Sequence, residues 1–275
     1  MERQVVMSSS SPSSSSAGSI KLERRDQIAW ITLNDPDRRN PLTPEFIPRM
    51  LAIFDELEAD PACRVAVLTG TGKAFCAGAE LSTIVNAEGI DAEVQFRLVR
   101  GFNRVIARIR EVDLPVIAAI NGVAVGGGAA LALACDFAIA SEKASLMFAF
   151  GRIGAASADM GLTWLLPRMV GIARARQLLL TGETLDAKAA QGLGLVTDVV
   201  ASDALHSAAE AIARKVITAT PRRAAAATKL SIDHGQGVDL ATALGYEAYL
   251  QTLMFQTAEH RERLSAFLAG RGRTG

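Results

Sequence analysis

Residues Pro115–Gly128 have the sequence PVIAAINGVAVGGG, an apolar run that ends in three consecutive glycines. The apolar run is typical of a buried strand, and the apolar residues that follow, Ala129–Ala134, are predicted to form a helix. Glycines at the start of a helix leave its first N–H groups uncovered, at the positive end of the helix dipole. Such a place favours an anion, or an oxygen that gains negative charge during a reaction. The alternative is that the glycines only allow the helix to pack closely on a sheet.

Strand and helix patterns alternate on both sides of this segment. Short apolar runs predict strands at Ile20–Glu23, Gln27–Leu33, Val65–Leu68, Pro115–Ile120, Asp136–Ala140 and Leu195–Val199. Helical spacing predicts helices at Asp91–Glu111, Leu162–Met169, Ala173–Leu180 and Ala187–Gln191. The alternation implies right-handed βαβ units around a mainly parallel sheet, which is an α/β fold.

One further helix is predicted between the second and third strands. Its apolar stripe consists of Phe46, Met50, Ile53, Phe54 and Leu57. Thr43 is predicted to be its N-cap and Pro44 its first helical residue, since both residue types favour those positions. After the third strand, residues 69–89 are predicted to form a long loop.

Composition divides the chain into three parts. Residues 1–19 form a Ser-rich tail that is predicted to be disordered, and residues 20–200 form the α/β core. Residues 201–275 are predicted to be helical only, with helices at Asp203–Ala219, Arg222–His234, Leu240–Thr257 and Glu259–Leu268. These helices look too extended to close a core of their own, so we expect them to pack on the core or on a neighbouring subunit.

The overall composition excludes several classes of protein. Lys plus Arg equals Asp plus Glu, at 29 each, whereas a nucleic-acid-binding protein usually has a basic excess. No apolar run approaches the ~18 residues of a membrane span. The three cysteines have no metal-ligand spacing and no carboxylate cluster suggests a metal, so we expect no metal site. So few cysteines favour a reducing compartment, and we predict a cytoplasmic protein.

Three ordered motifs resemble the crotonase (enoyl-CoA hydratase/isomerase) superfamily. They are KAFCAGAEL at 73–81, the glycine-ended run at 117–128 followed by ALACD at 132–136, and WLLPR at 164–168. The resemblance extends from about residue 20 to the C-terminus. It implies a crotonase-like ββα spiral core with a C-terminal helical trimerisation region, and a homotrimer or dimer of trimers. It also implies a substrate carried as a coenzyme A thioester, with no permanently bound cofactor.

The resemblance also implies roles for particular residues. Members of the family polarise the thioester carbonyl with two main-chain N–H groups, which correspond here to Ala79 and Gly127. The turn that contains Ala77, Ala79, Glu80 and Leu81 resembles the coenzyme A pocket. Arg38 and Arg39 lie in a second segment of that kind and are candidates to pair with phosphates, unless they only form a solvated loop. Glu80 is expected to brace the turn.

This chain departs from the family pattern at the catalytic carboxylates. Hydratases of the family position water with two glutamates, and the corresponding residues here are Ala130 and Phe150. Asp159 remains nearby, in a segment that resembles the loop with the catalytic aspartate of dienoyl-CoA isomerases and of 4-chlorobenzoyl-CoA dehalogenase. An aspartate in a partly apolar pocket suits proton abstraction, although it can also cap the next helix.

We therefore expect an enzyme that isomerises a double bond through a thioester enolate, with double-bond isomerisation favoured over two-glutamate hydration. Ala79 and Gly127 would hold the oxyanion, and Asp159 would act as acid and base. Two alternatives remain open. One is a non-catalytic member that binds acyl-CoA, and the other is a thioester hydrolase or dehalogenase with Asp159 as nucleophile.

Overall fold

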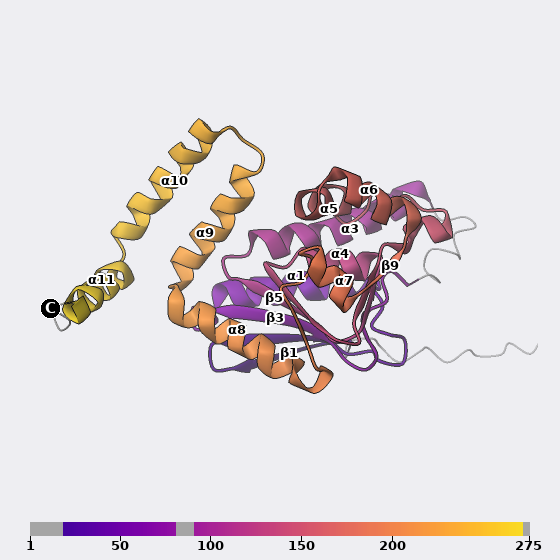
Figure 1. The fold of residues 1–275 in the computed structure, drawn as a ribbon, viewed down its shortest axis with the longest axis horizontal. Coiled ribbons are helices and arrows are strands. Elements are labelled where there is room, and N and C mark those ends of the chain that lie inside the picture. Colours follow the sequence, from indigo (N-terminus) through magenta and orange to yellow (C-terminus); the bar gives the residue numbers. More distant parts are fainter. Residues whose placement is uncertain (1–18, 81–90, 272–275) are drawn as a thin grey trace, which may run out of the picture.

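The computed structural model describes residues 19–80 and 91–271 and contains two β-sheets flanked by helices (Figure 1). The predicted tail and Leu81 lie outside these residues, apart from Ser19. The larger sheet has the order β1-β2-β3-β5-β7-β10, in which only β1 is antiparallel to its neighbour. Its strands are β1 (Ile20–Arg25), β2 (Ile28–Leu33), β3 (Val65–Gly70), β5 (Val116–Ile120), β7 (Phe137–Ser141) and β10 (Asp198–Val200). All the strands that the sequence predicted therefore belong to this sheet.

The smaller sheet has the order β4-β6-β8-β9, and none of its strands was predicted. The strands are β4 (Ala74–Cys76), β6 (Val123–Val125), β8 (Ser145–Met147) and β9 (Thr184–Asp186). The prediction of a continuous loop over residues 69–89 is therefore wrong at β4. Each strand has only three residues, which is too short for an alternating pattern to be visible in the sequence.

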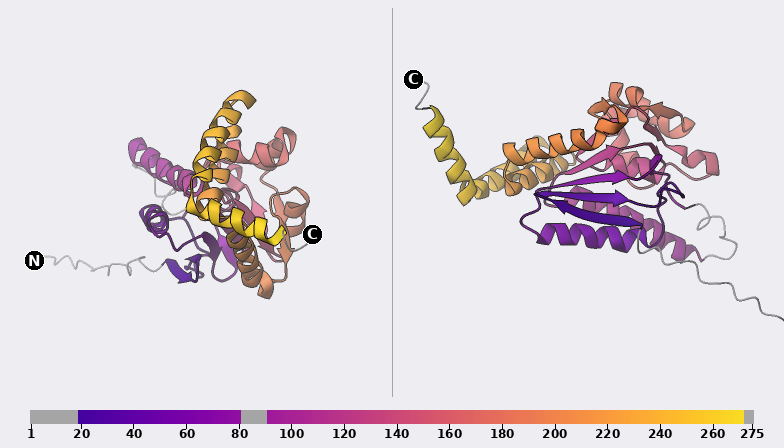
Figure 2. Two further views of the ribbon diagram at one scale, coloured as in Figure 1. Left: turned by 90° about the vertical axis from the view of Figure 1, so that its left-hand side faces the viewer. Right: turned by 90° about the horizontal axis from the view of Figure 1, so that it is seen from below.

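Helices cover both faces of the larger sheet (Figure 2). The face toward the main core packs against α1 (Phe46–Ala59) and α3 (Ala92–Glu111), and the opposite face packs against α8 (Leu205–Ala219). The predicted apolar stripe of α1 is buried throughout. The other helices that precede α8 in the chain are α4 (Gly127–Leu133), η1 (Ala149–Ile153), α5 (Leu162–Val170), α6 (Ile172–Thr181), α7 (Ala187–Gly192) and η2 (Ser202–Ala204).

The start of α1 differs from the prediction. The helix begins at Phe46 after Glu45, so Thr43 is not its N-cap and Pro44 is not its first residue. The reason is tertiary: Leu42 forms a parallel bridge with Ala79, which holds the chain extended at that point. Residues 43–45 make the turn from the bridge into the helix, and the Phe46 N–H donates to the Thr43 carbonyl at 3.1 Å.

Three helices end the described chain, of which α9 packs against α3 and the other two project from the body of the molecule. They are α9 (Arg222–Gly235), α10 (Leu240–Phe255) and α11 (Ala258–Arg271), close to their predicted ranges. Figures 1 and 2 show α10 and α11 projecting beyond the sheets, and α10 has no buried side chain. Within residues 19–80 and 91–271, no helix is both long and apolar enough to cross a membrane.

Candidate active site

Two turns meet where the parallel strands β4 and β6 end. These strands pair through Ala74 with Val123 and through Cys76 with Ala124, so the chain leaves both at the same edge. A Cβ on Gly78, after β4, would lie 3.5 Å from the nitrogen of Gly127, after β6. Gly78 has a φ of +86°, so its conformation also favours glycine. The two segments that the sequence singled out, 73–81 and 117–128, are therefore in direct contact.

The N–H of Ala79 points away from Leu42, to which the flanking residues Gly78 and Glu80 are hydrogen-bonded. The Leu42 N–H donates to the Gly78 carbonyl at 2.8 Å, and the Glu80 N–H donates to the Leu42 carbonyl at 3.1 Å. In a parallel bridge of this kind, the residue between the two bonded neighbours directs its own N–H to the other side. Among the described residues the Ala79 N–H has no acceptor.

The Gly127 N–H is also available. Gly127 is the first residue of α4, where the helix itself provides no acceptor. The preceding Gly126 has a φ of +53° and uses its own N–H to bind the Met147 carbonyl at 2.8 Å. Within 19–80 and 91–271, nothing accepts a hydrogen bond from Gly127. The site thus has two donors on touching turns, neither of them used by the described chain.

Asp159 lies next to the residue that covers Gly127. A Cβ on Gly127 would lie 2.7 Å from Sδ of Met160 and 2.8 Å from Cδ1 of Leu42. Asp159 Oδ1 accepts the Met160 N–H at 2.8 Å, and Met160 itself has a φ of +46°. Burial raises the pKa of the Asp159 carboxyl, and the Met160 N–H opposes that rise. Asp159 is not the N-cap of α5, because that position is Gly161.

The two residues that we predicted to stand in place of the family's glutamates, Ala130 and Phe150, are both apolar and lie near the same turns. Ala130 is fully buried in α4 within the main core. Phe150 belongs to η1, and its ring lies 3.5–3.9 Å from the place of a Cβ on Gly126. The segment of Phe150 therefore reaches the glycine triplet and presents an aromatic ring to it.

The charged candidates differ in their pairing. Arg38 binds Asp35 at 3.2 Å and also pairs with Glu80, so it braces the turn that contains Ala79. Arg39 is exposed, and no ion pair of its side chain is found among the described residues. Its carbonyl accepts the Ala77 N–H at 3.0 Å, which ties the two predicted coenzyme A segments together.

Sequence reasoning missed several residues that shape these turns. Leu42 and Met160 contact Gly127 from distant parts of the chain, and no local pattern marks them. Asn40 and Asn121 hold the start of β4 through side-chain hydrogen bonds. The Asn-Pro and Asn-Gly pairs in which they occur are turn signals, which offered the one local hint.

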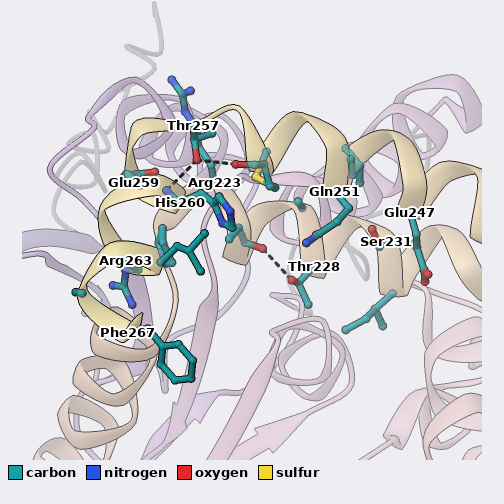
Figure 3. A pocket seen from close by; sticks show the side chains of 18 residues that line it. Arg223, Thr228, Ser231, Glu247, Gln251, Thr257, Glu259, His260, Arg263 and Phe267 are labelled. Carbon is teal, nitrogen blue, oxygen red and sulfur yellow. Dashed lines mark hydrogen bonds between the residues drawn. The ribbon is translucent and has the colours of Figure 1, made fainter. Parts of the chain in front are cut away.

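A separate groove lies elsewhere, among the C-terminal helices. A groove of about 990 Å³ separates α9, α10 and α11, and Figure 3 shows Arg223, His260, Arg263 and Phe267 along it. This groove is distant from β4 and β6 in the fold and is lined by helix faces that no described segment covers. No group of three or more His, Cys, Asp or Glu side chains suited to a metal occurs in the described part of the chain.

Comparison with known proteins gives consistent matches. A family model described as enoyl-CoA hydratase/isomerase matches residues 23–272. The chain is 37% identical over 245 residues to 1,2-epoxyphenylacetyl-CoA isomerase of Escherichia coli K12, covering 89% of this chain and 93% of that protein. It is 33% identical over 259 residues to short-chain-enoyl-CoA hydratase of Clostridium acetobutylicum, covering 92% and 95%. A crystal structure of enoyl-CoA hydratase from Bacillus anthracis superposes with a TM-score of 0.86 at 34% identity, covering 92% and 96%.

Proposed function

Because the chain belongs to the enoyl-CoA hydratase/isomerase family of the crotonase superfamily, we propose that it isomerises a double bond in an acyl-CoA thioester through an enolate. The observation that supports this most is the contact between the Gly78–Ala79 turn and Gly127, with Asp159 one residue from the side chain that covers Gly127. We propose that the two main-chain donors and the Asp159 carboxylate act on one substrate.

The thioester carbonyl oxygen would accept hydrogen bonds from the Ala79 and Gly127 N–H groups. Removal of a proton next to the thioester places negative charge on that oxygen. Donors already fixed in position stabilise the charge without reorganising, and one such donor is worth roughly 3 kcal/mol of barrier. Both donors belong to the main chain, so the small residues at these positions leave room for the thioester.

Asp159 would move the proton. Its carboxylate takes a proton from a carbon of the acyl chain, and the C–H electron pair moves into the enolate. The carboxylic acid then returns the proton to another carbon of the conjugated system, and the double bond shifts with no net change in atoms. The raised pKa of Asp159 suits a group that alternates between base and acid.

Isomerisation fits the site better than hydration. Adding water to a double bond requires side chains that orient and deprotonate the water, and the residues in the corresponding places are Ala130 and Phe150. The contact of the Phe150 ring with Gly126 supports the proposal that Phe150 occupies the place of the second glutamate. A single carboxylate is enough for a proton shuttle.

The coenzyme A part would lie along the turn from Ala77 to Leu81 and the loop before α1. Of the two candidate arginines we assign phosphate binding to Arg39, because Arg38 is already paired with Asp35 and Glu80. We further propose a homotrimer or dimer of trimers in the cytoplasm, in which a second copy covers the exposed faces of α10.

The test is an assay of 2-enoyl, 3-enoyl and dienoyl CoA esters with the wild-type protein and with Asp159→Asn. We expect double-bond isomerisation that falls by ~10²- to 10⁴-fold in the variant. Asp198→Asn is the matched control, because Asp198 is exposed on β10. Wild-type activity in Asp159→Asn would contradict the assigned role. Tight ester binding with no product would favour the binding-only alternative, and an acyl adduct on Asp159 would favour the nucleophile alternative.

A further inference from the structure

Two asparagine side chains, one buried and one half-buried, converge on one carbonyl oxygen at the start of β4. Asn40 Nδ2 donates to the Ala74 carbonyl at 2.8 Å, and Asn121 Nδ2 donates to the same oxygen at 3.1 Å. A carbonyl oxygen has two lone pairs, so this one can accept both bonds. The asparagines come from different parts of the fold: Asn40 precedes α1, and Asn121 lies in the turn between β5 and β6.

Each asparagine also binds the chain around β4. Asn40 is 2% exposed, and its Nδ2 also lies 3.0 Å from the Thr71 carbonyl and 3.2 Å from the Phe75 carbonyl, so its two hydrogens are shared among three carbonyls. Its Oδ1 accepts the Asp35 N–H at 2.8 Å, which fixes the loop to which Asn40 belongs. The main chain of Asn40 has a φ of +55°, a conformation that asparagine tolerates better than most residues.

Asn121 makes a matching set of bonds from the other side. Its Oδ1 accepts the Gly70 N–H at the end of β3 at 3.0 Å, and its Nδ2 also donates to the Gly72 carbonyl at 3.2 Å. A Cβ on Gly70 would lie 2.6 Å from the Ala74 carbonyl oxygen and 2.8 Å from Asn40 Nδ2. The two amides, Gly70 and the first residue of β4 therefore form one closely packed unit, which we term the asparagine clamp (Asn40, Asn121, Gly70 and Ala74).

The asparagine clamp fixes the first residues of the two strands, β4 and β6, that lead to the turns with Ala79 and Gly127. β4 leads from Ala74 through Ala77 to Ala79, and Ala77 is itself bound to the carbonyl next to Asn40. β6 begins two residues after Asn121 and leads to Gly127. A movement of either asparagine would shift one turn against the other.

We infer that the asparagine clamp sets the relative positions of the Ala79 and Gly127 N–H groups, so that Asn40 and Asn121 are positioning residues for the oxyanion site. The inference rests on the proposed function. Neither side chain is placed against substrate. Each acts through β4 or β6, and a misplacement of ~1 Å at the reacting centre can lower the rate by about 100-fold.

The test uses Asn40→Asp and Asn121→Asp in the full chain. Aspartate keeps the oxygen that accepts the Asp35 or Gly70 N–H and replaces the donating amide with a second oxygen. Thr69→Val is the control, because the Thr69 hydroxyl donates one bond to the Ala119 carbonyl at 2.8 Å, between β3 and β5, and forms no hydrogen bond with β4 among the described residues. The probe is hexadienoyl-CoA, whose absorption moves to longer wavelength when its thioester carbonyl is polarised.

We expect the folded Asp variants to bind the probe within threefold of wild type. They should lose at least half of the wavelength shift, and kcat should fall by ~10- to 100-fold. The control should keep the shift and the rate. A full shift and rate in the folded Asp variants would overturn the inference, as would failure of both variants to fold when the control folds. A wild-type protein without any shift would instead refute the proposed function.

Discussion

Gly127 and Gly128 are neighbours in the sequence, but their surroundings differ. A Cβ on Gly127 would meet the mobile ends of the Met160 and Leu42 side chains. A Cβ on Gly128 would overlap the Cys76 main-chain carbonyl in β4, which cannot rotate away. At Gly127 the nearest atoms are the ends of side chains, whereas Gly128 lets α4 lie directly against the main chain of β4. The packing interpretation of the triplet is therefore confirmed at Gly128, and the anion-binding interpretation of Gly127 stays a prediction.

This difference predicts unequal costs of adding a methyl group. Gly128→Ala should lower the free energy of unfolding by about 3 kcal/mol or more, whereas Gly127→Ala should cost only about 1 kcal/mol because side chains can yield. Gly151→Ala is the control, since nothing lies within 4 Å of a Cβ there, and it should change stability by less than ~0.5 kcal/mol. Urea unfolding would measure all three. Equal losses for Gly127→Ala and Gly128→Ala would contradict the described packing.

The raised pKa of Asp159 predicts the direction of the pH dependence. As a base, Asp159 must be ionised in the free enzyme, so kcat/KM should fall with decreasing pH through an apparent pKa above that of an exposed aspartate. The carboxyl also contributes to stability below its unfolded pKa, and this contribution is lost as the pH rises through its folded pKa. A pH–rate profile would locate the acid limb. The prediction is wrong if that limb lies in the ordinary range of an aspartate.

At the scale of elements, α9 is fixed to the core by cations that reach carbonyls and carboxylates of other segments. Lys229 is 7% exposed and donates to the carbonyls of Ile109 at 2.7 Å and Leu114 at 3.1 Å. It also pairs with Asp136 at 2.9 Å. Arg222, at the start of α9, binds Asp113 at 2.7 Å. The exposed helices α10 and α11 thus follow a helix, α9, that is bound to the core.

Removal of the Lys229 cation should strongly weaken the attachment of α9 to the core. Lys229→Met removes the cation that pairs directly with the half-buried Asp136 carboxylate, and we expect a loss of about 3–5 kcal/mol in the free energy of unfolding. Lys188→Met, at an exposed position on α7, is the control and should have little effect. Denaturant unfolding would measure both. A cost below about 1 kcal/mol for Lys229→Met would show that the buried pair is not needed to hold α9.

At the scale of the whole molecule, the C-terminal helices expose more apolar surface than a stable monomer usually does. On α10, Leu240 is 75% exposed and Tyr249 is 79% exposed, and Leu253 and Phe255 are also exposed. Extended apolar surface of this kind is typical of an interface between proteins. The groove of Figure 3 is lined by other residues of α10, among them Leu250 and Met254, and we propose that a second copy of the chain covers both surfaces.

If the proposed trimer forms through the groove, a charged residue introduced there should reduce the mass of the assembly in solution. Leu250 lies on α10 and lines the groove, so Leu250→Glu would place a carboxylate against the partner. Light scattering after gel filtration should show a wild-type mass of three or six chains and a variant mass of one chain. Lys215→Glu, at an exposed position on α8, should keep the wild-type mass. A wild-type protein with the mass of a single chain would contradict the proposal.

The sequence by itself determined the six-stranded sheet and the C-terminal helices, because each has a hydrophobic period long enough to be seen locally. The motifs of the sequence also identified the family, which the comparisons confirm. The catalytic roles that the same motifs suggest for Ala79 and Gly127 stay predictions. Only the tertiary structure revealed the four three-residue strands, since so short a strand has no period of its own and exists through its neighbours. The late start of α1, the pairing of Arg38 with Glu80 and the asparagine clamp are likewise contacts between segments 30 or more residues apart. Such contacts form only when the folded chain brings distant segments together, and no local pattern encodes them.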